Sequence, residues 1–179
     1  MEFSGKKVTV VGTGISGSGA VGLLNAVGAE VVLYDGNEKL KIEDIEKKLG
    51  TYKAEIVLGE LTKELTDSSD LLVISPGVPI DSPVVKAFEA AGVPVWGEVE
   101  LAYAFDKGKV LAITGTNGKT TTTALVGQIV GAYHKDTFVV GNIGNPYTTE
   151  VLKSNKDSYT VAEISSFQLE PVHEFHPLV

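Results

Sequence analysis

The sequence alternates short runs of β-branched and other apolar residues with segments of helical character. Several runs are apolar without interruption, as in strands covered on both faces, and such alternation is typical of α/β proteins with mainly parallel sheets. The expected strands are Lys7–Val11, Glu30–Tyr34, Ala54–Leu58, Leu71–Ser75, Val93–Trp96, Val110–Thr114, Thr137–Val140 and Ser158–Glu163. The expected helices lie near Gly17–Val27, Glu38–Leu49, Pro83–Ala91, Val99–Phe105 and Thr120–Ala132.

A polar, glycine-containing turn, "AFDKGKV" from Ala104 to Val110, predicts a domain boundary. We expect residues 1–106 to form a Rossmann-like parallel-sheet domain and residues 107–179 to form part of a P-loop ATPase α/β domain. The second unit stops after one helix and three strands. We therefore expect the chain to be an N-terminal fragment whose central domain is incomplete and whose C-terminal domain is absent.

The composition excludes several classes of function. The 179 residues include no cysteine and no arginine, and the net charge is −8. Without cysteine, disulfides and thiolate zinc sites are ruled out. An acidic chain without arginine is poorly suited to nucleic acid, and no apolar run approaches the roughly 18 residues of a membrane span. We expect a cytoplasmic protein with neither a nucleic-acid nor a membrane partner.

The first glycine-rich turn is "VVGTGISGSG". Gly12, Gly14 and Gly17 fit G-x-G-x-x-G between an expected strand and an expected helix, and Asp35 ends the next strand, near the place of a ribose-binding acid in dinucleotide folds. Glycines let the backbone approach an anion, and the helix start supplies N–H donors. A tight strand-to-helix crossover also needs such glycines without any ligand. We favour a ligand site, with NAD as only one possible occupant.

A second turn, "SPGVPIDSP", follows the fourth expected strand. Its prolines and Gly77 would make a rigid turn at a carboxyl strand end, where open α/β sheets place ligands. The same residues are also explained by turn chemistry alone.

The strongest signal is "GTNGKTTTT", which begins at Gly115. It resembles a phosphate loop but is shorter than the Walker A pattern, which would require a glycine where Ile113 stands. Backbone amides after Gly115 could surround a phosphate, Lys119 could reach the β- and γ-phosphates, and Thr120 or Thr121 could offer a hydroxyl to Mg²⁺. The alternative is a capped helix start with an incidental lysine.

Two further turns follow expected strands of the second unit. Glu163 ends the strand in "SYTVAEISSFQLE", and its carboxylate could bind Mg²⁺, which prefers oxygen ligands. A surface ion pair is the alternative for this glutamate. Asn142 lies in "GNIGNP", where it could face the same edge of the sheet or simply belong to a chain reversal.

The segments "GTGISGSG", "ISPGVP", "GEVEL", "GTNGKTTTT", "GNIG" and "EISSFQLE" occur in an order that resembles the Mur ligases, and most of all their D-glutamate-adding members. The resemblance spans nearly the whole chain. It implies three domains and ATP-dependent addition of D-glutamate to UDP-N-acetylmuramoyl-L-alanine through an acyl phosphate, in peptidoglycan precursor synthesis. The first glycine turn would then hold the uridine-diphosphate end of the substrate and the second would hold ATP.

The resemblance also implies roles for individual residues. Lys119 and Glu163 would be catalytic, and Thr120 and Glu163 would hold Mg²⁺. The implied ATP-binding residues are Gly115, Thr116, Asn117, Gly118, Lys119, Thr120 and Thr121. The implied substrate-binding residues are Gly14, Ile15, Ser16, Asp35, Gly36, Asn37, Ser75, Pro76, Gly77, Asn142 and Ser165. D-glutamate would bind mostly in the absent C-terminal region.

The chain departs from the family after Asp35, where Gly36 and Asn37 replace a basic residue that some relatives carry. Two other functions remain open from the sequence. One is a nicotinamide-dependent oxidoreductase resting on the first glycine turn and Asp35, which leaves the second phosphate loop unexplained. The other is a UDP-sugar-binding module without catalysis, and we expect these 179 residues alone to be inactive as a ligase.

Overall fold

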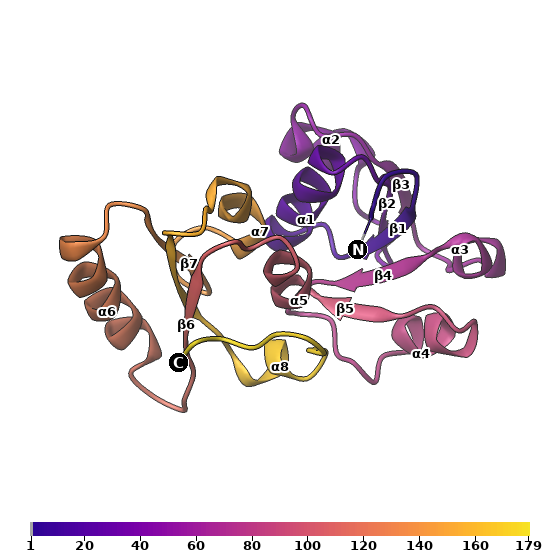
Figure 1. Ribbon diagram of the computed structural model, residues 1–179. Helices are drawn as coiled ribbons and strands as arrows, with labels where there is room; N and C mark the ends of the chain where they lie inside the picture. Colours follow the sequence, from indigo (N-terminus) through magenta and orange to yellow (C-terminus); the bar gives the residue numbers. More distant parts are fainter. Residues whose placement is uncertain (1) are drawn as a thin grey trace. The chain divides into compact units, whose positions relative to one another are not determined.

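The computed structural model describes residues 2–179 and shows two compact α/β units, the first running to Glu98 and the second from Val99 to Val179 (Figure 1). Each unit contains one sheet whose strands are all parallel, so the expected fold class is confirmed. The units divide one short helix earlier than the turn at 104–110. No helix within residues 2–179 is long and apolar enough to span a bilayer.

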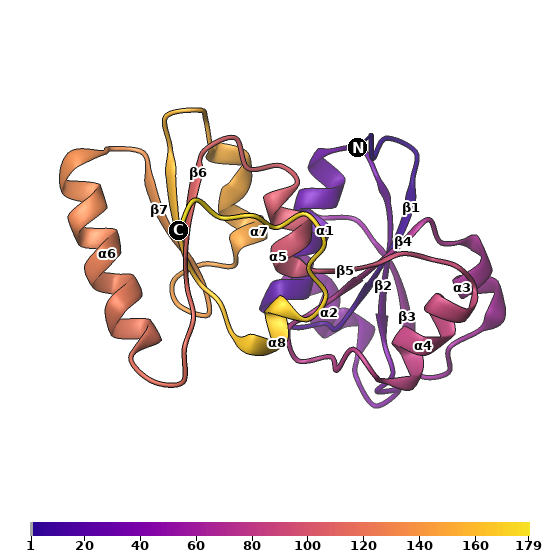
Figure 2. The ribbon, with the colours of Figure 1, turned by 60° about the horizontal axis from the view of Figure 1, so that its bottom comes forward.

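The first unit has a five-stranded sheet with the order β3-β2-β1-β4-β5. Its elements are β1 (Lys7–Val11), α1 (Ile15–Ala26), β2 (Glu30–Asp35), α2 (Ile42–Leu49), β3 (Glu55–Leu58), α3 (Lys63–Ser68), β4 (Leu71–Ile74), α4 (Pro83–Ala90) and β5 (Val95–Gly97). Helices α1 and α2 lie together on one side of the sheet, and α3 and α4 lie together on the other (Figures 1 and 2). This is the doubly wound arrangement, in which the strand order reverses between β1 and β4.

The core of this unit follows from its continuously apolar strands. Strand β4 is buried at all four positions, and Leu72 and Ile74 pack in one cluster with Phe88 of α4 and Leu65 of α3. A strand covered on both faces needs apolar residues at consecutive positions, which explains why these runs do not alternate with polar residues.

Three of the differences between the expected and observed elements of the first unit have a local explanation. β5 begins at Val95 rather than at Val93, because Pro94 has no N–H to donate to the strand ladder. α2 begins at Ile42 rather than Glu38, because the side chain of Asn37 accepts the Lys39 N–H at 3.1 Å and turns the chain first. The six-residue α3 was not expected, although its N-cap Thr62 accepts the N–H of Leu65 at 3.3 Å.

The second unit has a three-stranded sheet with the order β6-β8-β7. Its elements are β6 (Lys109–Ile113), α6 (Lys119–Tyr133), β7 (Thr137–Gly141), α7 (Tyr147–Glu150), the 3₁₀ helix η1 (Val151–Lys153), β8 (Tyr159–Glu163) and α8 (Ser166–Leu169), and α5 (Glu98–Tyr103) begins at the boundary between units. In the register of the sheet, Glu163 of β8 pairs with Ile113 of β6 on one side and with Gly141 of β7 on the other. The loops that follow these strands therefore emerge at one edge.

Helix α5 is attached to the second unit by Glu100, whose side chain is 1% exposed. Its carboxylate accepts backbone N–H groups from His173, Glu174 and Phe175 at 2.8–3.1 Å. The ring of Tyr103 packs edge-to-face on Phe175, with centroids 5.2 Å apart. These contacts explain why the compact units divide before α5 and not after it.

Candidate functional site

The loop that was predicted to bind phosphate joins the end of β6 to the start of α6 over the five residues 114–118, and is called the phosphate loop below. Gly115 has φ 146° and Gly118 has φ 77°, both in the region that side-chain-bearing residues rarely adopt. These two glycines therefore permit the short loop. Thr116 and Asn117 between them are exposed, so the loop is open to a ligand.

The start of α6 presents donors to this loop. Gly118 is the N-cap, and no side chain in residues 2–179 caps the helix there, so the first N–H groups of a 15-residue helix are available to an anion. Lys119 lies across the loop and its Nζ donates to the carbonyl oxygen of Gly115 at 2.7 Å. A phosphate group in the loop would find both the helix N-terminus and an ammonium group.

Glu163 faces the same loop from the end of β8. Its side chain is 5% exposed, and Thr120 Oγ1 donates to Glu163 Oε1 at 3.3 Å. The other carboxylate oxygen, Oε2, is buried without a hydrogen-bond partner in the described part of the chain. A buried charged oxygen without a partner is costly, so the site is electrostatically incomplete by itself.

A magnesium ion fits this donor set. Mg²⁺ favours oxygen ligands and is usually held by one or two protein groups, with phosphates and water completing the octahedron. The Thr120 hydroxyl and the Glu163 carboxylate are such groups. Within residues 2–179 no cluster of three or more His, Asp or Glu side chains offers a metal site made of protein ligands alone.

Asn142 lies directly beside Glu163. Its backbone N–H donates to the carbonyl oxygen of Glu163 at 3.1 Å, and its side chain is exposed. A Cβ on Gly141 would come within 2.2 Å of the same oxygen, so glycine permits this close approach of β7 to β8. Ser165, two residues after Glu163, is the N-cap of α8, and its hydroxyl and backbone N–H both contact Gln168 Oε1. Asn142, Glu163 and the phosphate loop thus share one edge.

The glycine turn of the first unit is equally tight. Gly12 has φ 105°, and a Cβ on Gly17 would lie 1.9 Å from the carbonyl oxygen of Gly12. Gly14 is the N-cap of α1, where no side chain among residues 2–179 provides a cap hydrogen bond. Ile15 is 79% exposed and Ser16 is half-buried. The start of α1 is therefore open at the carboxyl edge of the sheet.

Asp35 fastens this turn to the end of β2. Its Oδ2 accepts from the Thr13 N–H at 3.2 Å and from the Thr13 hydroxyl at 2.9 Å, and its Oδ1 accepts from the Asn37 N–H at 3.1 Å. Gly36 and Asn37 are exposed just beyond it. Thr13 was not anticipated from the sequence, where the only signal was a hydroxyl residue between two motif glycines.

The turn after β4 lies against the glycine turn. A Cβ on Gly12 would come within 2.8 Å of Ser75 Oγ, and this hydroxyl is buried without a partner among residues 2–179. Pro76 is half-buried and Gly77 is exposed. The fold therefore brings the three groups of residues expected to bind substrate in this unit to the carboxyl ends of β1, β2 and β4.

Comparison with known families decides the assignment. The Mur ligase MurD-like N-terminal domain matches residues 6–97, and the Mur ligase middle domain matches residues 113–178. The chain belongs to the Mur ligase family.

Two curated relatives are similar to the chain over nearly its whole length. The chain is 69% identical over 179 residues to UDP-N-acetylmuramoylalanine--D-glutamate ligase of Lachnospira eligens, covering 100% of this chain and 40% of the relative. It is 56% identical over 178 residues to the enzyme of the same name from Lachnoclostridium phytofermentans, covering 99% of this chain and 39% of the relative. The chain thus spans about 40% of the length of these relatives.

A solved Mur ligase structure shares the fold. The UDP-N-acetylmuramate:L-alanyl-gamma-D-glutamyl-meso-diaminopimelate ligase from Neisseria meningitides aligns with a TM-score of 0.55 at 20% identity, over 89% of this chain and 52% of that one. Both glycine turns of the present Mur ligase chain lie within the segments matched by the two family domains.

Proposed function

We propose that this chain carries the UDP-substrate site and the ATP site of an ATP-dependent amide ligase, which adds D-glutamate to UDP-N-acetylmuramoyl-L-alanine in peptidoglycan precursor synthesis. The observation that carries the proposal is the meeting of Lys119, Thr120 and Glu163 at one sheet edge, where Glu163 Oε2 is buried without a partner within residues 2–179. The names of the two relatives support the same reaction.

The reaction requires activation of a carboxylate. In the proposed sequence an oxygen of the alanyl carboxylate attacks the γ-phosphorus of ATP, and ADP leaves. The amine of D-glutamate then attacks the carbonyl carbon of the acyl phosphate, loses a proton and displaces inorganic phosphate. The first step brings two anions together, so cationic groups that offset their repulsion lower its barrier.

The phosphate loop supplies those groups. Backbone N–H groups from Gly115 to Thr121 would hold the phosphates, and the Lys119 ammonium, which lies on Gly115 in this structure, would swing toward the β- and γ-phosphates. Thr120 and Glu163 would hold Mg²⁺, which supplies charge neutralisation at the phosphoryl oxygens when bound. Asn142 and Ser165 would contact the muramoyl end of the substrate.

The first unit would hold the nucleotide end of the substrate. Because the chain contains no arginine, its donors for a phosphate are backbone N–H groups, hydroxyls and lysine, and a metal ion could also contribute. The open start of α1 at Gly14, Ile15 and Ser16 and the turn from Ser75 to Gly77 offer such donors. The segment from Asp35 to Asn37 would border the uracil ring.

A nicotinamide-binding function is the second candidate, because Asp35 ends β2 where dinucleotide folds place a ribose-binding acid. In this structure both oxygens of that carboxylate already accept hydrogen bonds from Thr13 and Asn37. This arrangement favours a structural role for Asp35. A second phosphate loop also has no use in an oxidoreductase of this kind.

Calorimetry on the 179-residue chain tests the proposal. We expect heat of binding with UDP-N-acetylmuramoyl-L-alanine, and separately with a non-hydrolysable ATP analogue in the presence of Mg²⁺, but not with NAD. Binding of NAD in place of the UDP-linked ligand would support the oxidoreductase.

We expect turnover from a longer protein, because the chain spans about 40% of the length of its relatives. In a chimera with the remaining sequence of the Lachnospira eligens relative, phosphate release should require ATP, UDP-N-acetylmuramoyl-L-alanine and D-glutamate together. A chimera that binds the UDP-linked ligand but releases no phosphate would indicate a binding module without catalysis.

A further inference from the structure

The segment between β7 and α7, residues 142–146, carries Asn142 and is closed by two backbone contacts. The Asn142 N–H donates to the Glu163 carbonyl oxygen at 3.1 Å, and the Gly141 N–H donates to the Asn145 carbonyl oxygen at 3.1 Å. Gly141 and Gly144 both have positive φ, at 101° and 74°. We call residues 141–146 the asparagine loop. Because glycine loses more conformational freedom than other residues, this loop needs outside contacts to stay in one conformation.

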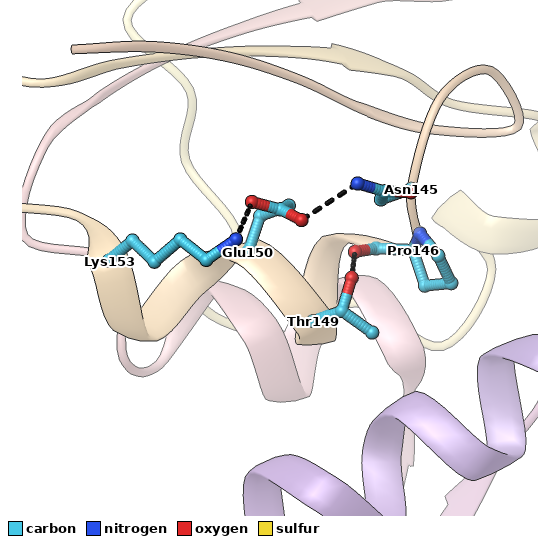
Figure 3. Close-up of polar contacts among 5 residues, drawn as sticks. All are labelled: Asn145, Pro146, Thr149, Glu150 and Lys153. Carbon is cyan, nitrogen blue, oxygen red and sulfur yellow. Dashed lines mark hydrogen bonds and ion pairs between the residues drawn. The ribbon is translucent and has the colours of Figure 1, made fainter.

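Those contacts come from Glu150, the last residue of α7 (Figure 3). Glu150 Oε1 accepts from the side-chain amide of Asn145 at 2.8 Å, and Glu150 Oε2 accepts from Lys153 Nζ at 2.6 Å. The side chain of Glu150 is only 14% exposed, whereas that of Lys153 is 62% exposed. Each carboxylate oxygen thus has its own partner, and the oxygen that accepts from Asn145 is not the one that contacts Lys153.

Helix α7 is itself held on the unit. The Thr149 hydroxyl donates to the Pro146 carbonyl oxygen at 2.7 Å, which secures the start of the helix beside the loop (Figure 3). Tyr147 is 1% exposed, and its hydroxyl donates to Asp106 Oδ2 at 2.6 Å. The same oxygen accepts from the Thr160 hydroxyl of β8 at 2.8 Å. Glu150 therefore projects from an anchored element, and the loop is the part that its side chain can restrain.

We propose that Glu150 is a positioning residue, which holds the asparagine loop so that Asn142 lies against Glu163, ready to contact the muramoyl-alanyl part of the substrate. This inference rests on the proposed function of the site. A loop already in its bound conformation loses less entropy when substrate binds. Removing the Glu150–Asn145 hydrogen bond should therefore lower the affinity for the muramoyl substrate and leave the affinity for ligands that bind elsewhere unchanged.

The simpler role for Glu150 is an ion pair with Lys153 that stabilises α7 and η1. Lys153 is 62% exposed, so solvent screens its side of this pair and reduces its contribution to stability. Three variants distinguish the two roles. Glu150→Gln keeps an oxygen for Asn145 but loses the ion pair, and Lys153→Met also loses only the ion pair. Glu150→Leu loses both contacts. Asn145→Ala removes the loop side of the contact and is the second variant if Glu150→Leu does not fold.

The decisive measurement is calorimetry of the 179-residue chain with UDP-N-acetylmuramoyl-L-alanine and, for comparison, with UDP. Glu150→Leu and Asn145→Ala should each lower the affinity for the first ligand about 3- to 10-fold, which is the effect expected from losing one hydrogen bond. Their affinity for UDP should stay within about twofold of wild type. Glu150→Gln and Lys153→Met should both bind like wild type. Equal weakening by Lys153→Met, or weakening of UDP as well, would overturn the positioning role.

A double-mutant cycle shows whether Glu150 acts through Asn142. In the Asn142→Ala background, Glu150→Leu should cause no further loss of affinity, whereas independent effects would multiply and would contradict the proposal. Hydrogen exchange gives a readout without substrate: the Asn142 amide should exchange faster in Glu150→Leu than in wild type, and equal rates would also overturn it. If wild type binds no UDP-linked ligand, the proposed function fails, and the exchange experiment still decides whether Glu150 orders the loop.

Discussion

Thr120 Oγ1 lies 3.3 Å from Glu163 Oε1, although the two residues are 43 positions apart in the sequence. The parallel pairing of β6 with β8 produces this contact, because it places Ile113 opposite Glu163 and so aligns the phosphate loop with the end of β8. Sheet topology therefore assembles the proposed metal ligands.

Glu163→Gln should leave the metal-free protein at least as stable as wild type, because it replaces a buried carboxylate whose Oε2 has no partner in the described residues by a neutral amide. The same variant should bind a non-hydrolysable ATP analogue about 10-fold or more weakly with Mg²⁺ present. Thermal unfolding and calorimetry, each with and without Mg²⁺, check the two halves. A variant that keeps the full Mg²⁺ dependence of analogue binding would exclude Glu163 as a ligand.

Lys119→Ala should reduce the affinity for the ATP analogue about 10- to 100-fold, because a charge-assisted contact to phosphate is lost. Affinity for UDP-N-acetylmuramoyl-L-alanine should not change, since that ligand is assigned mainly to the first unit. Lys156→Ala, which removes an exposed lysine of the same unit, is the matched control. If Lys119→Ala lowered the affinity for both ligands by the same factor, the two glycine turns would have been assigned to the wrong ligands.

Gly17→Ala should destabilise the first unit by about 3 kcal/mol or more, because its Cβ would lie 1.9 Å from a backbone oxygen that cannot move aside without opening the turn. Gly14→Ala is the control, because a Cβ there meets nothing within 4 Å and the residue has φ −79°. Urea unfolding of the two variants checks the difference. Equal midpoints would mean that the turn is looser than the structure indicates.

Asp70 should make a pH-dependent contribution to stability. The backbone N–H of Lys7 and, secondarily, the ammonium of Lys6 hold the pKa of this exposed carboxyl below its usual value of 3.8. A lowered folded-state pKa gives stability that is present above the unfolded-state value and is lost as the pH falls through the folded-state value. The urea midpoint of Asp70→Asn should lie slightly below wild type at pH 7, and the gap should close in acid. If the difference between the two midpoints instead grew as the pH fell, Asp70 would not have the lowered folded-state pKa on which this prediction depends.

Much of this architecture follows from local sequence patterns. Continuous apolar runs predict the strands because parallel sheets are covered on both faces, and the glycines with Lys119 predict a phosphate loop because residues with side chains rarely adopt those backbone angles. Glu163 was predicted as a candidate metal ligand from its position at a strand end. These signals depend on neighbours in the chain, so they can be recognised without coordinates.

The remaining features depend on tertiary contacts. Helix α7 has four residues and α8 has four, too few for a helical period to show in the sequence. Asp106 was part of a polar turn in the sequence, yet its carboxylate holds Tyr147 and Thr160 from 41 and 54 positions away. The contact between Thr13 and Asp35 likewise arises only when β1 pairs with β2.

The strand order β6-β8-β7 has a consequence for biosynthesis. β8 emerges from the ribosome after β6 and β7, yet it is the strand that joins them. Until residues 159–163 have been translated, the other two strands have no neighbour in this sheet, and Thr120 lacks the Glu163 carboxylate that its hydroxyl contacts. The sheet of the second unit therefore cannot form until β8 has been synthesised, and its apolar strands stay unpaired until then. During that interval the nascent chain would depend most on chaperones.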